Sequence, residues 1–192
     1  MSERGRHTHA SNAEADLLCA GRHLLSRDLP DTDDEGAKFG TQVHGALASE
    51  DDSGASVPVK DIAESCRKIA DKVIRQVFSE EEILTAKIRK EYRYWMDIGP
   101  YRHSGQVDEN HITPGKALVI EWKSLAGDIA TSPRNLQLRD QAVLTWINEY
   151  DATPDIEIVT VVVQPLVTHS PELCVYDGDA LDQAHAELVL RV

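Results

Sequence analysis

The spacing of apolar residues changes close to residue 78, and this change restricts the folds that the chain can adopt. Before it, apolar side chains recur every three to four positions, the period of an amphipathic helix, as in Ile62, Cys66, Ile69, Val73 and Val77. After it, three successive stretches follow a period close to two, which indicates strands: IRKEYRYWMDI, HSGQVDE and ALVIEWK. Helices are therefore expected before an antiparallel meander of three strands.

The segments on either side extend this order. Two helices are expected before the long one: the first from Ser11, where Ser11 and Glu14 suit a capping box, and the second over residues 37–50. After the meander, the pattern predicts a helix over residues 133–150 and two strands, IEIVTVVVQPL and LCVYD. Asp179 is expected to cap a closing helix. The predicted order is α, α, α, β, β, β, α, β, β, α.

Length and composition favour one domain. With 192 residues and 41% apolar composition, the chain can bury one sizeable core. We expect a flexible tail over residues 1–10 and a single domain over residues 11–192. No stretch resembles a membrane span or a signal peptide, so a cytoplasmic protein without a membrane partner is expected.

The three cysteines lie far apart without a CxxC pair, and they are interpreted as core thiols.

The net charge of −13 argues against nucleic-acid binding through bulk electrostatics. The negative charge is concentrated in two segments, because residues 31–56 and 151–192 together carry fifteen acidic and two basic side chains. Residues 60–93 instead carry nine basic and seven acidic side chains. This segment is either a local cationic path or a solvated helix face.

Charged residues at the ends of two expected strands form the main candidate site. Glu121 and Lys123 lie two positions apart at the end of ALVIEWK, so they share one face of the strand, and Asp108 lies near the end of the preceding strand. If the strand register brings Asp108 and Glu121 together, their carboxylates suit Mg²⁺ or Mn²⁺, and Lys123 would face a phosphate. The alternatives are a solvated charge pair for Glu121 and Lys123, and a turn-forming role for Asp108.

The order of these residues resembles that of the PD-(D/E)XK nuclease superfamily. Gly-x-x-Asp at residues 105–108 is followed by Glu-x-Lys at residues 121–123 and by a helix that opens with Gln-Leu-Arg at residues 137–139. The chain more narrowly resembles the RecB-like exonuclease branch, including small phage-associated members, through a Cys-containing first helix, the stretch GTQVH, and the strand VTVVVQPLV.

The resemblance implies an α/β (α+β) fold, in which a restriction-endonuclease-like core has a mixed central sheet flanked by helices and carries added N-terminal helices. It implies a Mg²⁺- or Mn²⁺-dependent nuclease that hydrolyses DNA phosphodiester bonds, with an exonuclease role in recombination or repair. The expected setting is a bacterial or phage-infected cell. Expected partners are DNA and either further copies of the chain or a recombination protein.

Site residues also follow from the resemblance. It implies that His44, Asp108, Glu121 and the backbone carbonyl of Trp122 are metal ligands and that Lys123 is the catalytic lysine. The helix after the sheet would supply two residues to the substrate: Gln137 would orient Lys123 or touch the substrate backbone, and Arg139 would contact a phosphate.

The chain departs from the pattern of these relatives at Gln141, in its late cysteines, and at Glu121, where several relatives have aspartate. The relatives commonly place a tyrosine where this chain has Gln141. Some of them bind an iron–sulfur cluster through one early and three late cysteines, but only Cys174 is late in this chain, so no cluster is expected.

Other interpretations of the sequence stay open. His44 could be a core or surface histidine, and Arg139 an ordinary helix-surface residue. Two other classes of function compete with the nuclease. One is a catalytically silent nuclease-fold subunit or regulator that docks on a nucleoprotein partner, and the other is a metal-binding hydrolase of another substrate. The sequence also leaves open exonuclease or endonuclease activity, DNA or RNA as substrate, and one metal ion or two.

Overall fold

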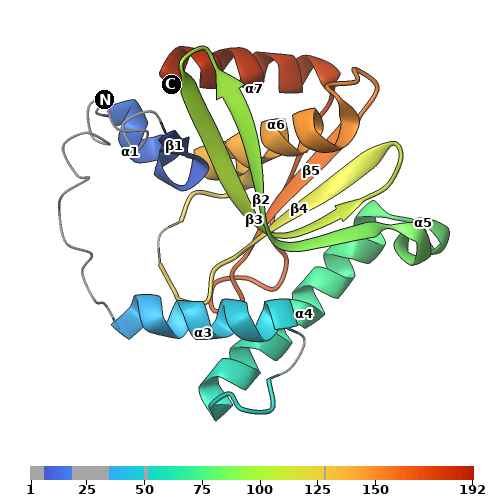
Figure 1. Cartoon of the computed structure of the whole chain (residues 1–192). Helices are drawn as coiled ribbons and strands as arrows, with labels where there is room; N and C mark the ends of the chain where they lie inside the picture. The colour runs from blue at the N-terminus through green and yellow to red at the C-terminus, as the bar shows by residue number, and fades with distance from the viewer. Residues whose placement is uncertain (1–6, 19–34, 50–51, 128) are drawn as a thin grey trace.

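The computed structural model of the chain describes residues 7–18, 35–49, 52–127 and 129–192, and it contains one mixed six-stranded sheet between helices (Figure 1). The expected meander is confirmed: β2 (Lys87–Ile98), β3 (Tyr101–Ile112) and β4 (Lys116–Trp122) pair antiparallel in sequence order. The strand β5 (Glu157–Val163) pairs parallel with β4, and β6 (Leu173–Tyr176) pairs antiparallel with β5. The expected mixed α/β architecture is therefore present.

Helices cover both faces of the sheet. On one face, α3 (Glu35–Ser49) and α4 (Val57–Val77) pack against side chains of β4 and β5, among them Leu118, Ile120 and Val161. On the other face, α6 (Leu136–Tyr150) and α7 (Gly178–Arg191) pack against Val107, Val119 and Ile158. The strand β4 is buried from both sides, which explains why its sequence is an unbroken apolar run up to Glu121.

Residues 7–10, the described part of the expected flexible tail, form regular elements, whereas residues 1–6 lie outside the described residues. His7–His9 form β1, which pairs parallel with β3, and the 3₁₀ turn η2 (Ala10–Asn12) and the short helix α1 (Ala13–Leu18) follow. Thr8 is buried and its Oγ1 lies 2.8 Å from Nδ1 of buried His103, so β1 is fixed to β3 by side chains as well as by backbone. Ser11 lies inside the turn η2, and α1 begins two residues later, at Ala13. The part of the expected first helix after Leu18, including Cys19, lies outside the described residues.

Gly105 of the Gly-x-x-Asp motif is explained by close packing. A Cβ atom at this position would lie 2.8 Å from Cδ1 of Leu144 on α6 and 3.1 Å from Cβ of Ala10. Glycine therefore lets α6 and the N-terminal turn approach β3 this closely without displacing Leu144 or Ala10.

Two helix starts differ in detail from the prediction. The helix expected from Pro133 begins as the 3₁₀ turn η3 (Ser132–Arg134), and α6 follows with Asn135 as its cap, whose Oδ1 accepts from Leu138 N at 3.1 Å. The cap of α7 is Asp177, which accepts from Ala180 N at 2.9 Å, so the prediction of Asp179 is wrong. Because β6 ends at Tyr176, the next residue already takes the cap position.

Besides β1, the helix after α4 was not predicted. The helix α5 (Glu80–Thr85) has no buried residue, but Ser79 and Glu82 form a reciprocal capping box in front of it. None of the described helices is long and apolar enough to cross a membrane.

Candidate metal centre and adjoining lysine

Three carboxylates lie side by side across the strands β2, β3 and β4. The pairs Lys90↔Glu109 and Tyr92↔Val107 place Glu91 opposite Asp108. The pair Glu109↔Ile120, continued by one residue, places Asp108 level with Glu121. The register that the sequence left open therefore brings these acidic residues together at the point where the meander meets α3.

His44, on α3, completes a cluster with two of these carboxylates. Its Nδ1 lies 3.3 Å from Oδ1 of Asp108 and 3.5 Å from Oε1 of Glu91. The ligand atoms of His44, Glu91 and Asp108 all lie within 4.8 Å of one another, a spacing at which they could hold one metal ion. One imidazole nitrogen and two carboxylate oxygens suit a divalent cation such as Mn²⁺ or Mg²⁺.

The orientation of the His44 ring is set by the backbone of β4. Nε2 of His44 lies 3.2 Å from the carbonyl oxygen of Trp122. In the tautomer that carries its proton on Nε2, the ring donates to this carbonyl and its Nδ1 lone pair faces the carboxylates, as a metal ligand requires. Neighbouring Val43 and Leu47 are buried against the sheet, so α3 itself holds the ring in place.

The cluster has a strong preference for positive charge. Hydrogen bonds with Asp108 and then Glu91 raise the pKa of His44 to about 10, although burial alone would lower it. The same contact with His44 lowers the pKa of Glu91. In the absence of a metal ion, the carboxylates therefore keep a proton on His44, and a bound divalent cation would replace this proton.

Glu91 was not predicted as a site residue, and its backbone explains why. Its φ of 49° is in the left-handed region, which bulky residues rarely adopt, and it interrupts the alternation of β2. Lys90 lines a cavity against α4, and the adjacent Glu91 contacts His44 on α3, so neighbouring side chains project toward the same layer of helices. In the sequence KIRKEYRYW, nothing marks this interruption.

A second group of polar side chains surrounds Glu121. Its Oε1 accepts from Nζ of Lys123 at 2.6 Å and from Nε2 of Gln137 at 2.8 Å. Nε2 of Gln141 lies 3.3 Å from the other oxygen, so the residue at the position of the relatives' tyrosine contacts this carboxylate. The position of Lys123 is thus fixed by Glu121, which α6 holds from the opposite side.

The charges in this second group depend on one another. Burial, followed by repulsion from Asp108, raises the pKa of Glu121, which is only 3% exposed. Burial alone would lower the pKa of Lys123, but the adjacent Glu121 carboxylate outweighs this effect, so the pKa of Lys123 is raised overall. Lys123 therefore keeps its positive charge at neutral pH.

Trp122 connects the two groups through its backbone. Its N–H donates to Oδ2 of Asp108 at 2.7 Å, and its carbonyl oxygen faces His44. The structure thus brings His44 and Asp108 together with Glu91, and it places Glu121, Lys123 and Gln137 beside them. Arg139 lies apart from this site, because its Nη1 pairs with Oε2 of Glu187 on α7 at 2.8 Å.

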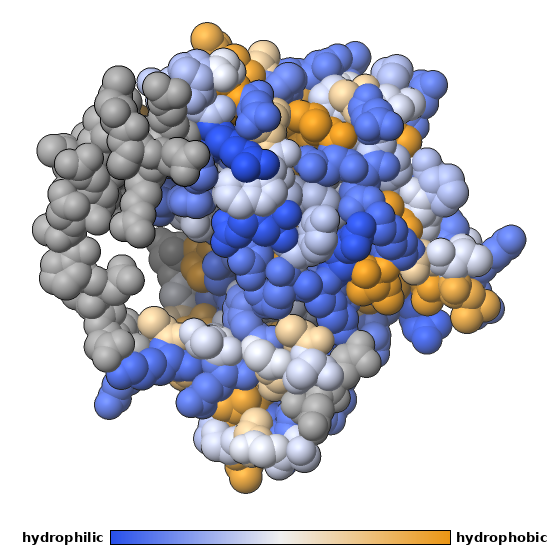
Figure 2. All heavy atoms as spheres, viewed as in Figure 1, coloured by the Kyte–Doolittle hydropathy of each residue, from blue (hydrophilic) through white to orange (hydrophobic). Residues whose placement is uncertain are grey.

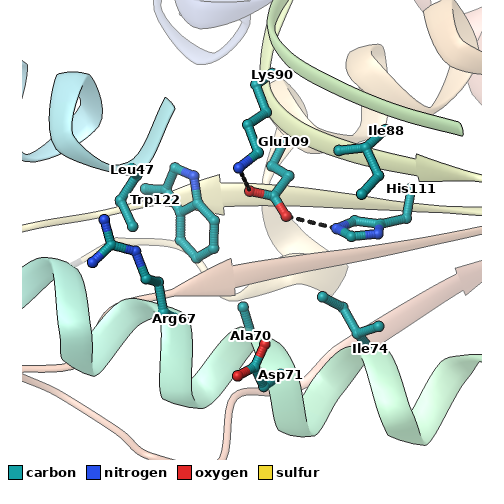
Figure 3. Close-up of a pocket in the computed structure, with 10 residues that line it drawn as sticks. All are labelled: Leu47, Arg67, Ala70, Asp71, Ile74, Ile88, Lys90, Glu109, His111 and Trp122. Atoms are coloured by element: carbon teal, nitrogen blue, oxygen red, sulfur yellow. Dashed lines mark hydrogen bonds and ion pairs between the residues drawn. The ribbon is translucent and has the colours of Figure 1, made fainter. Parts of the chain in front are cut away.

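Cavities flank the site on two sides. Lys123 and Gln137 line one of about 230 Å³, whose other walls include the N-terminal residues Ala10 and Glu14. A larger cavity of about 500 Å³ lies between α4 and the sheet and is lined by Trp122 (Figure 3).

Glu109 shows that closeness in sequence to Asp108 does not by itself place a carboxylate in the cluster. Figure 3 shows the Glu109 carboxylate between Lys90 and His111 in the larger cavity, with His111 Nε2 at 2.6 Å and Lys90 Nζ at 3.9 Å. Glu109 is therefore engaged outside the metal cluster and serves as a matched control for Asp108.

The strain at Glu91 gives a first testable prediction. Glu91→Gly and Glu91→Ala both remove the carboxylate, so both are expected to weaken Mn²⁺ binding measured by calorimetry. Only glycine relieves the left-handed backbone, so Glu91→Gly is expected to have a free energy of unfolding about 1 kcal/mol above that of Glu91→Ala in urea titrations. Equal stability of the two variants would show that the backbone at this position is not strained.

Comparisons with known proteins support the fold. No family model matches the chain, and no curated protein matches it significantly. A crystal structure from Eubacterium rectale, named "Putative exonuclease", aligns over 99% of this chain and 83% of its own, with a TM-score of 0.52 and 11% identity. A second structure, of SSO0001, aligns over 96% of this chain and 76% of its own with 10% identity, but its TM-score of 0.36 is too low to support the fold. The first likeness shows that the chain has a nuclease-like fold.

Proposed function

We propose that the protein is a metal-dependent nuclease that hydrolyses DNA phosphodiester bonds, with the narrower expectation of a RecB-like exonuclease acting in recombination or repair. The observation that carries the proposal is the direct connection of two groups through Trp122: the cluster of His44, Glu91 and Asp108, and the pair of Glu121 and Lys123. A cation site beside a fixed, positively charged lysine suits the hydrolysis of a phosphodiester.

His44, Asp108 and Glu91 would hold the cation. Glu121 is proposed as a further ligand because it lies level with Asp108 in the sheet, close enough for Asp108 to raise its pKa. The Trp122 carbonyl, which the resemblance implied as a ligand, lies on the Nε2 side of the His44 ring, away from the Nδ1 that faces the carboxylates, so we propose that it orients this ring and does not bind the cation. A Mg²⁺ or Mn²⁺ ion in this position would polarise a phosphoryl oxygen and lower the pKa of a bound water molecule.

Lys123 would stabilise the negative charge that develops on the phosphate. Its ammonium group is held by Glu121, and Gln137, which donates to the same oxygen, keeps that carboxylate in place. Lys123 and Gln137 both border the cavity of about 230 Å³, which we propose as the position of the scissile phosphate. Since Arg139 pairs with Glu187 on α7, it has no part in this proposal.

The test is a cleavage assay with the purified full chain. End-labelled linear duplex, single-stranded and circular DNA are each incubated with Mg²⁺, Mn²⁺ or EDTA. We expect nucleotides to be released from linear DNA with metal only, while circular DNA stays intact. Cutting of circular DNA would show an endonuclease instead. If the folded protein binds Mn²⁺ but cuts no substrate, the nuclease proposal fails in favour of a catalytically silent subunit.

A further inference from the structure

A line of hydrogen-bonded polar side chains leaves the metal cluster along one face of β2 and β3. Gln106 Nε2 donates to Oε2 of Glu91 at 2.5 Å. Arg93, opposite Gln106 in the sheet, donates to Oε1 of Gln106 at 2.9 Å and to Oγ of Ser104 at 3.1 Å. Nδ1 of His9 on β1 lies 2.9 Å from the same Ser104 oxygen. The line is thus fixed to three paired strands.

The next residue outward on this face is an aromatic one. Trp95 lies opposite Ser104, and the guanidinium of Arg102 lies 4.5 Å from the centroid of its ring. The ring of His7 meets Trp95 edge-on, with centroids 5.8 Å apart. Trp95 is half-buried, whereas the other two tryptophans, Trp122 and Trp146, are 2% and 3% exposed.

This face is the side of the hairpin away from α6 and α7. Tyr94 and Met96 alternate with Arg93 and Trp95 and are buried in the core that includes α6. Figure 2 shows hydrophilic side chains gathered over β2 and β3 on the side that faces the viewer, with α6 and α7 behind them in Figure 1. Within the described residues, α3 and α4 pack on β4 and β5 and leave this end of the hairpin uncovered.

The charge on this face contrasts with the net charge of −13 of the whole chain. Arg93 is exposed, and its hydrogen bonds go to the neutral side chains of Ser104 and Gln106. No carboxylate in the described part of the chain forms an ion pair with it. Arg102 faces Asp97 at 3.6 Å, but both side chains are more than half exposed, so this pair is weak.

From these observations, we propose that this face binds a single strand of nucleic acid and leads it to the metal cluster. A phosphate would lie at Arg93, and a base would stack on Trp95 and Arg102. Four residues along β2 separate Glu91 from Trp95, about 13 Å, so a strand held at the ring reaches the cluster. A single strand fits better than a duplex, because only an unpaired base has a free face for stacking. The inference rests on the proposed nuclease function and names the form of its substrate.

The test measures binding of a fluorescein-labelled oligodeoxythymidine of about twenty nucleotides by fluorescence anisotropy, in EDTA so that nothing is cut. Trp95→Leu and Arg93→Gln are each expected to weaken binding about tenfold, and Arg93→Gln to reduce the salt dependence by about one phosphate contact. Trp95→Phe keeps a ring and is expected to retain most of the affinity. Arg75→Gln, on the exposed surface of α4, makes the same charge change away from this face and is the matched control.

Two further measurements separate the inference from the function. Tryptophan fluorescence is expected to be quenched on binding in the wild type but not in Trp95→Leu, whose remaining tryptophans are buried. Cleavage of a small aryl phosphodiester, which reaches the metal cluster but not Trp95, reports the nuclease chemistry alone, and it is expected to be the same in Arg75→Gln and the wild type. If the protein cuts DNA but Trp95→Leu and Arg93→Gln bind the oligonucleotide as tightly as Arg75→Gln, the binding face is wrong and the nuclease proposal stands. If neither binding nor cleavage occurs, both fail.

Discussion

Replacing Lys123 with methionine is expected to lower the rate of DNA cleavage a hundred- to a thousandfold. The loss follows from removing a fixed cation beside the phosphate, and single donors to developing negative charge have effects of this size. Because Lys123 Nζ lies 2.6 Å from Oε1 of Glu121, its position does not depend on substrate binding. The rate is measured under single-turnover conditions with Mn²⁺ on end-labelled DNA.

The same strand provides the control. Lys116, at the start of β4, donates to the carbonyl of Val77 at 2.8 Å and pairs with Glu82, so Lys116→Met removes a tethered lysine away from the site. This variant is expected to cut at the wild-type rate. In Lys123→Met, buried Glu121 keeps its hydrogen bonds from Gln137 and Gln141. Because its pKa is already raised, the carboxylate can also take up a proton instead of staying charged without its partner, so the fold is expected to persist. Wild-type cleavage by folded Lys123→Met would rule out the proposed role of Lys123.

Elements with a long apolar pattern could be predicted from the sequence. The helix α4 and the meander of β2, β3 and β4 each present a run of side chains to a core, and this run sets the period of the sequence. The strand β1 and the helix α5 have three and six residues, and neither contributes a repeating apolar face. Their positions depend on contacts with the rest of the fold, as between Thr8 and His103.

The site residues that belong to a sequence motif or lie at the end of an apolar strand could be predicted. Glu121 and Lys123 follow from the end of β4 and from the resemblance. Asp108 follows from the resemblance alone, because it lies inside β3, which continues to Ile112 and not to the expected end at residue 109. The register of β3 and β4 then brings the two carboxylates level. Glu91 was not predictable, because its participation depends on one left-handed residue within β2. The face of α6 was equally hidden in the sequence: Gln137 and Gln141 lie one turn apart toward Glu121, whereas Arg139 points toward α7.

Asp108→Asn is expected to weaken Mn²⁺ binding by about a hundredfold or more. Asn keeps the size of the side chain and an oxygen that can accept from Trp122 N, so the strands should stay paired, but a neutral amide is a much poorer ligand than a carboxylate. At a Mn²⁺ concentration of one hundred times the wild-type dissociation constant, the metal should stabilise the wild type by about 2.7 kcal/mol. For a hundredfold weaker variant, the gain should fall to about 0.4 kcal/mol, as measured by thermal unfolding with and without metal.

Glu109→Gln tests whether this effect belongs to the cluster or to any acid on this strand. Glu109 follows Asp108 directly, but its carboxylate is engaged by His111 and Lys90 in the larger cavity. This variant is therefore expected to keep the stabilisation by Mn²⁺ and the metal-dependent cleavage that Asp108→Asn loses. The opposite result, with Asp108→Asn still stabilised and Glu109→Gln not, would place the metal ion in the cavity beside α4 and remove His44 from its ligands.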